Sequence, residues 1–175
     1  MRAHAARIAP AVGATAERLP VRSASVDAVA VGQAFHWFDA PVALAEIARV
    51  LRPGGTLALL WNDRDNRVPW VDAVTAAIHA HDPGIAYEKD IDWPAVIASG
   101  GGAFTPVSVR TYEHDHPMDV ELVVERAMST SYVAASSDAV RAALAEKVRS
   151  ILASFGIEGS FGFPHVTTSY VCTRC

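Results

Sequence analysis

Residues 25–61 read SVDAVAVGQAFHWFDAPVALAEIARVLRPGGTLALLW, and this stretch decides the fold class of the 175-residue chain. It begins with an apolar run of β-branched and small residues at 26–31, which is the composition of a parallel strand buried on both faces. A second apolar run at 57–61 has the composition of another strand.

A helix is expected between these two strands. Asp39 can accept hydrogen bonds from the first helical turn. The apolar residues that follow recur at helical spacing, so that one stripe can face a sheet: Leu44, Ile47, Ala48 and Leu51. Arg52-Pro53-Gly54-Gly55 is expected to end the helix. The order strand, helix, strand with short turns predicts one βαβ unit, and hence an α/β fold with a parallel sheet.

Weaker patterns after residue 65 predict further elements. Helices are expected at 70–81, 119–128 and 138–155, and strands at 104–112 and 166–172. No repeat, low-complexity tract or shift in composition marks a linker between domains. We therefore expect residues 1–175 to form a single domain.

The composition excludes several classes of partner. A charged fraction of 19% and a net charge of −4 leave no basic surface of the kind that binds nucleic acid. No run reaches the roughly 18 apolar residues that span a bilayer, and the first seven residues lack the apolar core of a secretory signal. The sequence predicts a cytoplasmic protein with no membrane and no nucleic-acid partner.

Two groups of residues could bind a metal, but the sequence favours a simpler interpretation of each. Cys172 and Cys175 have CxxC spacing at the end of the chain, with His165 as the nearest third ligand, and are interpreted as solvent-facing thiols. His114 and His116 would share one face of a strand and could chelate a metal. They are interpreted as a polar strand end before Pro117, and we predict no metal site.

Residues 13–65 resemble the middle of a type 11 class I S-adenosylmethionine-dependent methyltransferase. The resemblance rests on fragments that occur together in the family's order and spacing: Ala16-Glu17, Leu19-Pro20, Ser25-Val26-Asp27, Gln33-Ala34-Phe35-His36-Trp37, Glu46, Arg49-Val50-Leu51 and Arg52-Pro53-Gly54-Gly55. It implies a Rossmann-like methyltransferase sheet with helices on both faces, S-adenosylmethionine as the cofactor and a small-molecule acceptor. Residues 1–65 would form the cofactor-side core, and 66–175 the substrate-side helices and closing strands.

The resemblance also implies where the cofactor would bind. Thr15, Ala16 and Glu17 would lie beside the adenine ring, with the Thr15 hydroxyl in place of the Asp of many relatives. The loop after the first strand would flank the cofactor through Gln33, Ala34, Phe35 and Trp37, and Phe35 or Trp37 would close over its apolar parts. His36 would orient or deprotonate the acceptor, which makes it the catalytic candidate.

Each of these roles has a structural alternative. Phe35, Trp37 and Phe38 are equally compatible with core aromatics between sheet and helix. A packed or hydrogen-bonded histidine is a more frequent role for a lone residue such as His36 than a general base. Direct displacement of a methyl group needs alignment of the acceptor and requires no base. The acceptor itself is not fixed, because the segment 87–102 carries no recognisable chemistry.

The family's first two β-α units have no counterpart in the sequence. They would carry a glycine-rich loop and a ribose-binding acid, whereas only Gly13 precedes Gly32 in this chain. The resemblance thus implies an N-terminally truncated domain that lacks these two units, with weakened cofactor binding and impaired methyl transfer. The alternative function is a non-catalytic module of the methyltransferase fold that self-associates through an exposed sheet edge.

Overall fold

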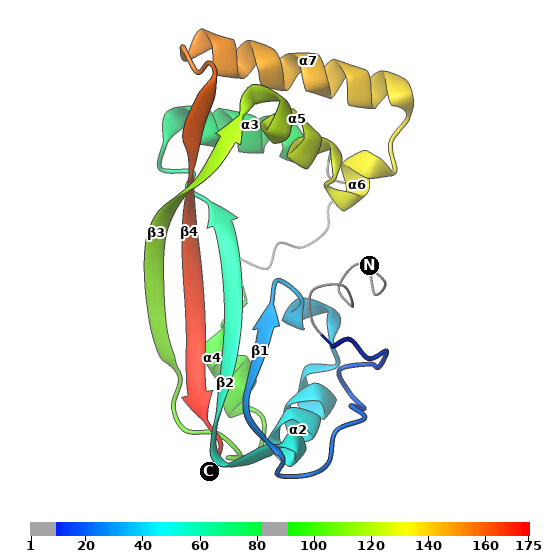
Figure 1. The fold of residues 1–175 in the computed structure, drawn as a ribbon, viewed down its shortest axis with the longest axis vertical. Coiled ribbons are helices and arrows are strands. Elements are labelled where there is room, and N and C mark those ends of the chain that lie inside the picture. Colours follow the sequence, from blue (N-terminus) through cyan, green and yellow to red (C-terminus); the bar gives the residue numbers. More distant parts are fainter. Residues whose placement is uncertain (1–9, 82–90) are drawn as a thin grey trace. The chain divides into compact units, whose positions relative to one another are not determined.

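The computed structural model describes residues 10–81 and 91–175 (Figure 1). Residues 1–9 of the expected cofactor-side core and residues 87–90 of the segment 87–102 lie outside the described residues. Contacts within the chain divide it into two compact units. Unit 1 contains the described residues 10–61, 91–110 and 168–175, and unit 2 contains 62–81 and 111–167.

A four-stranded sheet has the order β1-β2-β4-β3. Its strands are β1 (Val26–Gly32), β2 (Leu51–Arg64), β3 (Ser108–Asp119) and β4 (Ser160–Thr173). β1 and β2 are parallel, with Val29 opposite Leu57 and Val31 opposite Leu59, which confirms the predicted βαβ unit. The mixed α/β fold class is also confirmed, whereas the direction of β4, opposite to that of β2, gives a mixed sheet (Figure 1).

The helix α2 (Ala40–Val50) connects β1 to β2. Asp39 caps it as predicted, because its carboxylate accepts a hydrogen bond from the Val42 N–H at 3.3 Å. The predicted apolar stripe is buried at Leu44, Ile47 and Leu51. A short 3-10 helix, η1 (Phe35–Trp37), precedes the cap.

The turn expected at 52–55 is instead part of β2. The helix ends at Val50 and the strand begins at the next residue, so β2 is longer than the apolar run that predicted it. Two glycines allow this direct entry. Gly54 has a φ of +79°, and a Cβ on Gly55 would lie 2.9 Å from the carbonyl oxygen of Arg52.

The expectation that β1 is buried on both faces is wrong. Val29 and Val31 pack against the core of unit 1, whereas Ala28 and Ala30 on the opposite face are exposed. β1 is an edge strand of the sheet, and within the described ranges only one of its faces is covered. A strand with the composition of one buried on both faces therefore lies at the edge of the sheet with one face exposed.

Unit 1 has its own apolar core, built from α2, β1, β2, β4 and the helix α4 (Trp93–Ala98). Two aromatic rings stack within it, because the ring centroids of Trp61 and Trp93 lie 4.5 Å apart. Both side chains are at least 95% buried. The indole of Trp93 fixes α4 against the sheet, although the sequence patterns did not predict this short helix.

Unit 2 has a second apolar core among its helices. They are α3 (Pro69–His79), α5 (Val120–Met128), α6 (Ser131–Ala134) and α7 (Asp138–Ser154). The helices predicted at 70–81, 119–128 and 138–155 are thereby confirmed. α3 and α5 both pack against α7, burying side chains such as Val74, Val123 and Leu144. No helix in 10–81 or 91–175 combines the length and the apolar character that a bilayer crossing needs.

The strand predicted at 104–112 is displaced in the structure, since β3 runs from Ser108 to Asp119. Residues 108–117 are all exposed, and residues 113–116 are all charged or histidine, so no apolar side chain marks this half of the strand in the sequence. His114 and His116 lie inside β3 and not at its end, because the strand continues through Pro117. The strand predicted at 166–172 is confirmed within the longer β4.

Candidate functional site

Both segments predicted to bind the cofactor lie in unit 1. The carboxylate of Glu17 accepts a hydrogen bond from the Asp39 N–H at 3.1 Å, just after the loop 33–37. The pKa of Glu17 is lowered by hydrogen bonds to its carboxylate. The largest contribution comes from the backbone N–H of Glu17 itself, followed by that of Asp39, and the Thr15 side chain acts in the same direction. Ala16 packs against the same apolar core as Phe35. Glu17 is therefore tied to the residue two positions after the loop 33–37, and Ala16 shares its core with Phe35 of that loop. The roles of Thr15, Ala16, Glu17, Gln33, Ala34 and Trp37 in cofactor binding stay predictions.

An ion pair on α2 holds the chain that follows Glu17. The carboxylate of Glu46 accepts bonds from Arg49 and from the Leu19 N–H, each at 2.7 Å. Arg49 also donates to the carbonyl oxygen of Val21 at 2.8 Å and to the hydroxyl of Ser23 at 3.0 Å. Arg49 is the main reason that the pKa of Glu46 falls to about 2. The resemblance pointed to both residues, but only the structure shows that they position the loop 19–23.

The aromatic residues of the loop 33–38 divide between the core and the surface. Phe35 is 1% exposed and meets Phe38 and Trp93 edge to face, with ring centroids 5.5 and 5.8 Å apart. Trp37 is 72% exposed. The helix and sheet enclose the side chain of Phe35, whereas Trp37 presents its ring to solvent. That Phe35 or Trp37 closes over a cofactor stays a prediction.

Gln33 and His36 complete the candidate loop. Gln33 has a φ of +52°, and its N–H donates to the carbonyl oxygen of Leu60 at 2.9 Å, which fixes the loop at the carboxyl end of β1. The imidazole of His36 lies 4.6 Å from the Trp37 ring. This contact is compatible with a packed histidine, and a catalytic role for His36 stays a prediction.

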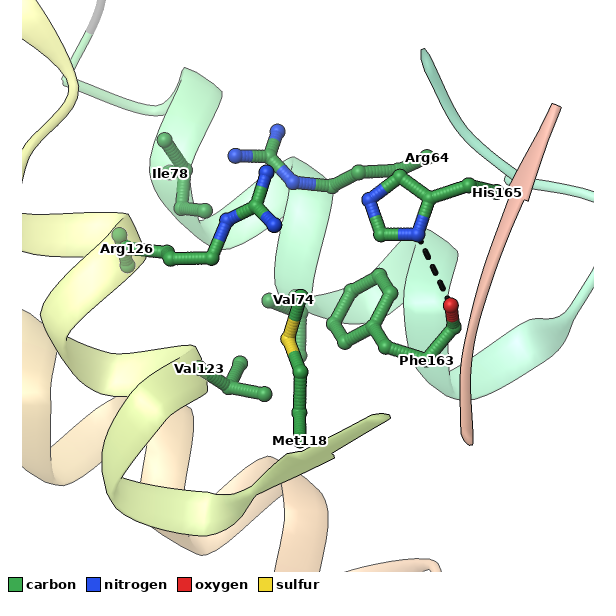
Figure 2. Close-up of a pocket in the computed structure, with 9 residues that line it drawn as sticks. Arg64, Val74, Ile78, Met118, Val123, Arg126, Phe163 and His165 are labelled. Atoms are coloured by element: carbon green, nitrogen blue, oxygen red, sulfur yellow. Dashed lines mark hydrogen bonds between the residues drawn. The ribbon is translucent and has the colours of Figure 1, made fainter. Parts of the chain in front are cut away.

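A pocket in unit 2 is lined by residues that the sequence did not single out. Figure 2 shows Arg64, Arg126 and His165 around a floor of apolar side chains. These three residues come from β2, α5 and β4, which are far apart in the chain. No local pattern could have placed them together, since only the packing of the elements does so.

The cysteine prediction needs a correction. Cys172 is 3% exposed and packs into the core of unit 1, whereas Cys175 is exposed. Burial raises the pKa of the Cys172 thiol to about 11. The chain end does not fray at this point because β4 is an inner strand of the sheet.

A third histidine lies beside the pair on β3. The ring centroid of His165 is 5.7 Å from that of His114 and 6.1 Å from that of His116. Among the described residues, however, no group of three His, Cys, Asp or Glu side chains has an arrangement that could hold a metal ion.

The chain is similar in sequence to proteins described as uncharacterized methyltransferases. Residues 1–59 match the family model described as a methyltransferase domain. Uncharacterized methyltransferases of Mycobacterium bovis and Mycobacterium tuberculosis are 34% identical over 163 residues, which cover 91% of this chain. The chain spans 62% of the length of these relatives. An uncharacterized methyltransferase of Schizosaccharomyces pombe is 59% identical over 58 residues, or 33% of this chain and 23% of its own.

Solved structures share the fold at lower identity. A protein of Anabaena variabilis, provisionally described as a methyltransferase from an antibiotic biosynthesis pathway, has a TM-score of 0.62 at 17% identity. The match covers 90% of this chain and 71% of that protein. A second protein, from Anaeromyxobacter dehalogenans and provisionally described as a type II methyltransferase, has a TM-score of 0.54 at 23% identity and covers 95% and 72% of the two chains.

Proposed function

Because this chain belongs to the methyltransferase family whose domain model matches residues 1–59, we propose that it acts in the transfer of a methyl group from S-adenosylmethionine to a small-molecule acceptor. The observation that carries the proposal is the contact between Glu17 and Asp39. It ties Glu17 to Asp39, two residues beyond the loop 33–37, and this loop follows the carboxyl end of β1, which is where ligands bind in sheets of this type.

The residues at this place fit the adenosine part of the cofactor through their apolar surface. Trp37 presents an exposed indole on which a planar base can stack. The Glu17 carboxylate and the Thr15 hydroxyl already bond to one another and to the backbone, so they act by shaping the loop. Trp37 would therefore hold the base, and hydrogen bonds to its edge would come from backbone groups of 15–17.

The chemistry supplied by S-adenosylmethionine, when bound, is an electrophilic methyl group on a sulfonium. The chain's own contribution is to position and to shield. Phe35 anchors the loop in the core, so that Trp37 can hold a fixed place at the surface. Transfer by direct displacement needs alignment above all, and this explains why the proposal requires no proton acceptor at His36.

Isothermal titration of the 175-residue chain with S-adenosylmethionine and S-adenosylhomocysteine tests the proposal. We expect saturable binding that Trp37→Ala weakens by about tenfold, as expected when one stacking partner is lost. Val42→Ala is a matched control, because Val42 is also an exposed apolar residue of unit 1. A folded chain that binds neither compound would contradict the cofactor site, and equal losses in both variants would remove Trp37 from it.

The open edge of β1 favours a second candidate function, association with another copy of this chain. β1 pairs with β2 on one side, and its backbone groups on the other side have no strand partner among the described residues. An unpaired strand of small and β-branched residues is a template for edge-to-edge pairing. The exposed side chains of Ala28 and Ala30 offer little steric hindrance to such a partner.

Sedimentation velocity over a range of protein concentrations tests this association. We expect a reversible dimer that is lost when Ala28 and Ala30 are both replaced by Lys, since charge on an edge strand opposes pairing. Ala153→Lys, on the exposed face of α7, is the control and leaves the dimer intact. A monomer at every concentration would exclude this second function.

A further inference from the structure

Three histidines meet in unit 2 where β3 pairs with β4. The imidazole of His165, on β4, is 2% exposed, and its ring centroid lies 5.7 Å from that of His114 and 6.1 Å from that of His116. His114 and His116 alternate with Glu113 and Asp115 along β3, so the two rings lie on one face of the strand. The fold therefore packs one buried histidine against two exposed ones.

The other elements around His165 present positive or apolar side chains. Arg126 from α5 and Arg64 from β2 line the same small pocket as its imidazole (Figure 2). The helix α3 contributes Val74 and Ile78, and among the described lining residues there is no carboxylate. Positive charge added at His165 is therefore close to other positive charge.

The carboxylates of β3 beside the two histidines lie on its other face. Glu113 accepts a hydrogen bond from Arg67 at 2.7 Å. Asp115 packs over β4 at Gly162, where an added Cβ would lie 2.7 Å from the Cβ of Asp115. Gly162 is three positions from His165, so the two residues face opposite sides of β4. These acids are therefore directed away from the three histidines.

A second proton on His165 is unfavourable while β3 stays paired. Nδ1 lies 2.8 Å from the carbonyl oxygen of Phe163, which can only accept, so Nδ1 carries the proton of the neutral ring and Nε2 takes up the second one. Burial lowers the pKa of His165, and the positive charges of Arg126 and of the other two histidines lower it further. Histidines gain their charge between about pH 8 and pH 5. A fall in pH through this range therefore favours a state in which the three rings separate and reach water.

Residues 111–117 of β3 can separate from β4 at low cost. They belong to an edge strand and are all exposed, so their departure would uncover little apolar surface. The ion pair between Glu113 and Arg67 also holds this segment, but the two side chains are 69% and 65% exposed, and such pairs contribute little. The pairing with β4 is therefore the main interaction of the segment within the sheet.

We propose that His114, His116 and His165 form a pH-sensitive switch that releases residues 111–117 from β4 in mildly acidic solution. At neutral pH the uncharged rings pack together and the segment stays paired. Protonation separates the rings, while the helices of unit 2 remain folded. The released segment leaves an open backbone edge on β4, which can pair with another strand. The switch lies within unit 2 and does not depend on cofactor binding or on methyl transfer.

Amide hydrogen exchange of the 175-residue chain, followed by NMR at pH 7 and at about pH 5.5, tests the proposal. The rates are expressed as protection factors, which remove the pH dependence of the chemical exchange step itself. We expect the protection of the amides at 111–116 to fall about tenfold or more, because each linked proton shifts the opening equilibrium. The amides of Leu144 and Val148, buried in α7, should keep their protection to a much greater extent.

Two variants assign the effect to the histidines. His165→Gln, and His114→Gln combined with His116→Gln, should each reduce the loss of protection at 111–116, whereas His81→Gln should leave it unchanged. The double variant changes only exposed side chains, so it decides the question even if His165→Gln does not fold. Three results would each overturn the proposal: unchanged protection at 111–116 in the unmodified chain, an equal loss in α7, or a loss of full size in the double variant.

Discussion

The backbone N–H of Asp39 donates a hydrogen bond of 3.1 Å to the carboxylate of Glu17. Asp39 uses its own carboxylate to accept from the Val42 N–H, so one residue caps α2 and also ties the segment 15–17 to it. The geometry of the proposed cofactor site therefore depends on the helix that links the two parallel strands.

Replacement of Glu17 by Gln should loosen the loop before α2. A neutral amide accepts a hydrogen bond more weakly than a carboxylate, so the bond from the Asp39 N–H should weaken. We expect amide hydrogen exchange at Asp39 to accelerate several-fold, to about tenfold at most, with little change in the melting temperature. Glu158→Gln changes an exposed acid in unit 2 and should not alter exchange at Asp39. Unchanged exchange in Glu17→Gln would mean that the contact contributes nothing to the loop.

Glu46 should make unit 1 sensitive to strong acid. Its pKa is lowered from 4.5 to about 2, mainly by the hydrogen bonds from Arg49. A carboxyl group with a lowered folded pKa stabilises the fold above pH 4.5 and loses this contribution as the pH falls toward 2. Urea unfolding followed by tryptophan fluorescence should show this decline between pH 5 and about pH 2. In Glu46→Gln the decline should be smaller than in the Glu158→Gln control, and identical profiles would exclude the mechanism.

His165 should make unit 2 less stable in mildly acidic solution. Burial, and then the charges of Arg126, His114 and His116, lower its pKa below 6.5 in the folded chain. The unfolded chain then binds more protons, so the free energy of unfolding should fall as the pH falls below 6.5. His165→Gln should remove part of this slope in urea titrations between pH 7 and about pH 5, whereas His81→Gln should keep it. If the free energy of unfolding of His165→Gln fell with pH as steeply as that of the unmodified chain, the pH dependence would arise from another group.

Gly55→Ala should destabilise unit 1. A Cβ there would lie 2.9 Å from the Arg52 carbonyl oxygen and 3.1 Å from that of Asp27, and neither backbone atom can move freely. We expect a loss of about 1–3 kcal/mol, as for other crowded core positions, measured by urea unfolding. Gly32→Ala is the matched control, because nothing lies within 4 Å of its added carbon. Equal stability of the two variants would show that the entry into β2 relaxes without cost.

The sequence predicted the βαβ unit well because local signals agree there. The apolar runs of β1 and β2, the cap at Asp39 and the spacing of Leu44 and Ile47 all indicate the same elements, and the structure confirms them. Each signal arises from residues within a few positions of one another. Such patterns predict the structure correctly where the buried residues recur with the period of the helix or strand itself.

The sequence failed where burial and contacts depend on distant segments. β3 is exposed along 108–117, and its residues 113–116 are all charged or histidine, so no apolar residue indicates the second half of the strand. Phe35 and Trp37 are two positions apart and chemically similar, yet one is buried and the other is exposed, because α4 supplies Trp93 as a neighbour for Phe35 alone. The rim of Arg64, Arg126 and His165 exists only once three separate elements have packed.

The two thiols differ in exposure, so a fluorescent dye can be attached to one of them selectively. Cys175 is exposed while Cys172 is buried with a pKa of about 11, so a maleimide dye added near neutral pH should attach at a single position. Cys172 can react only when β4 separates from the core of unit 1. The rate at which a second dye labels Cys172 would then measure the rate of that opening, without any engineered cysteine.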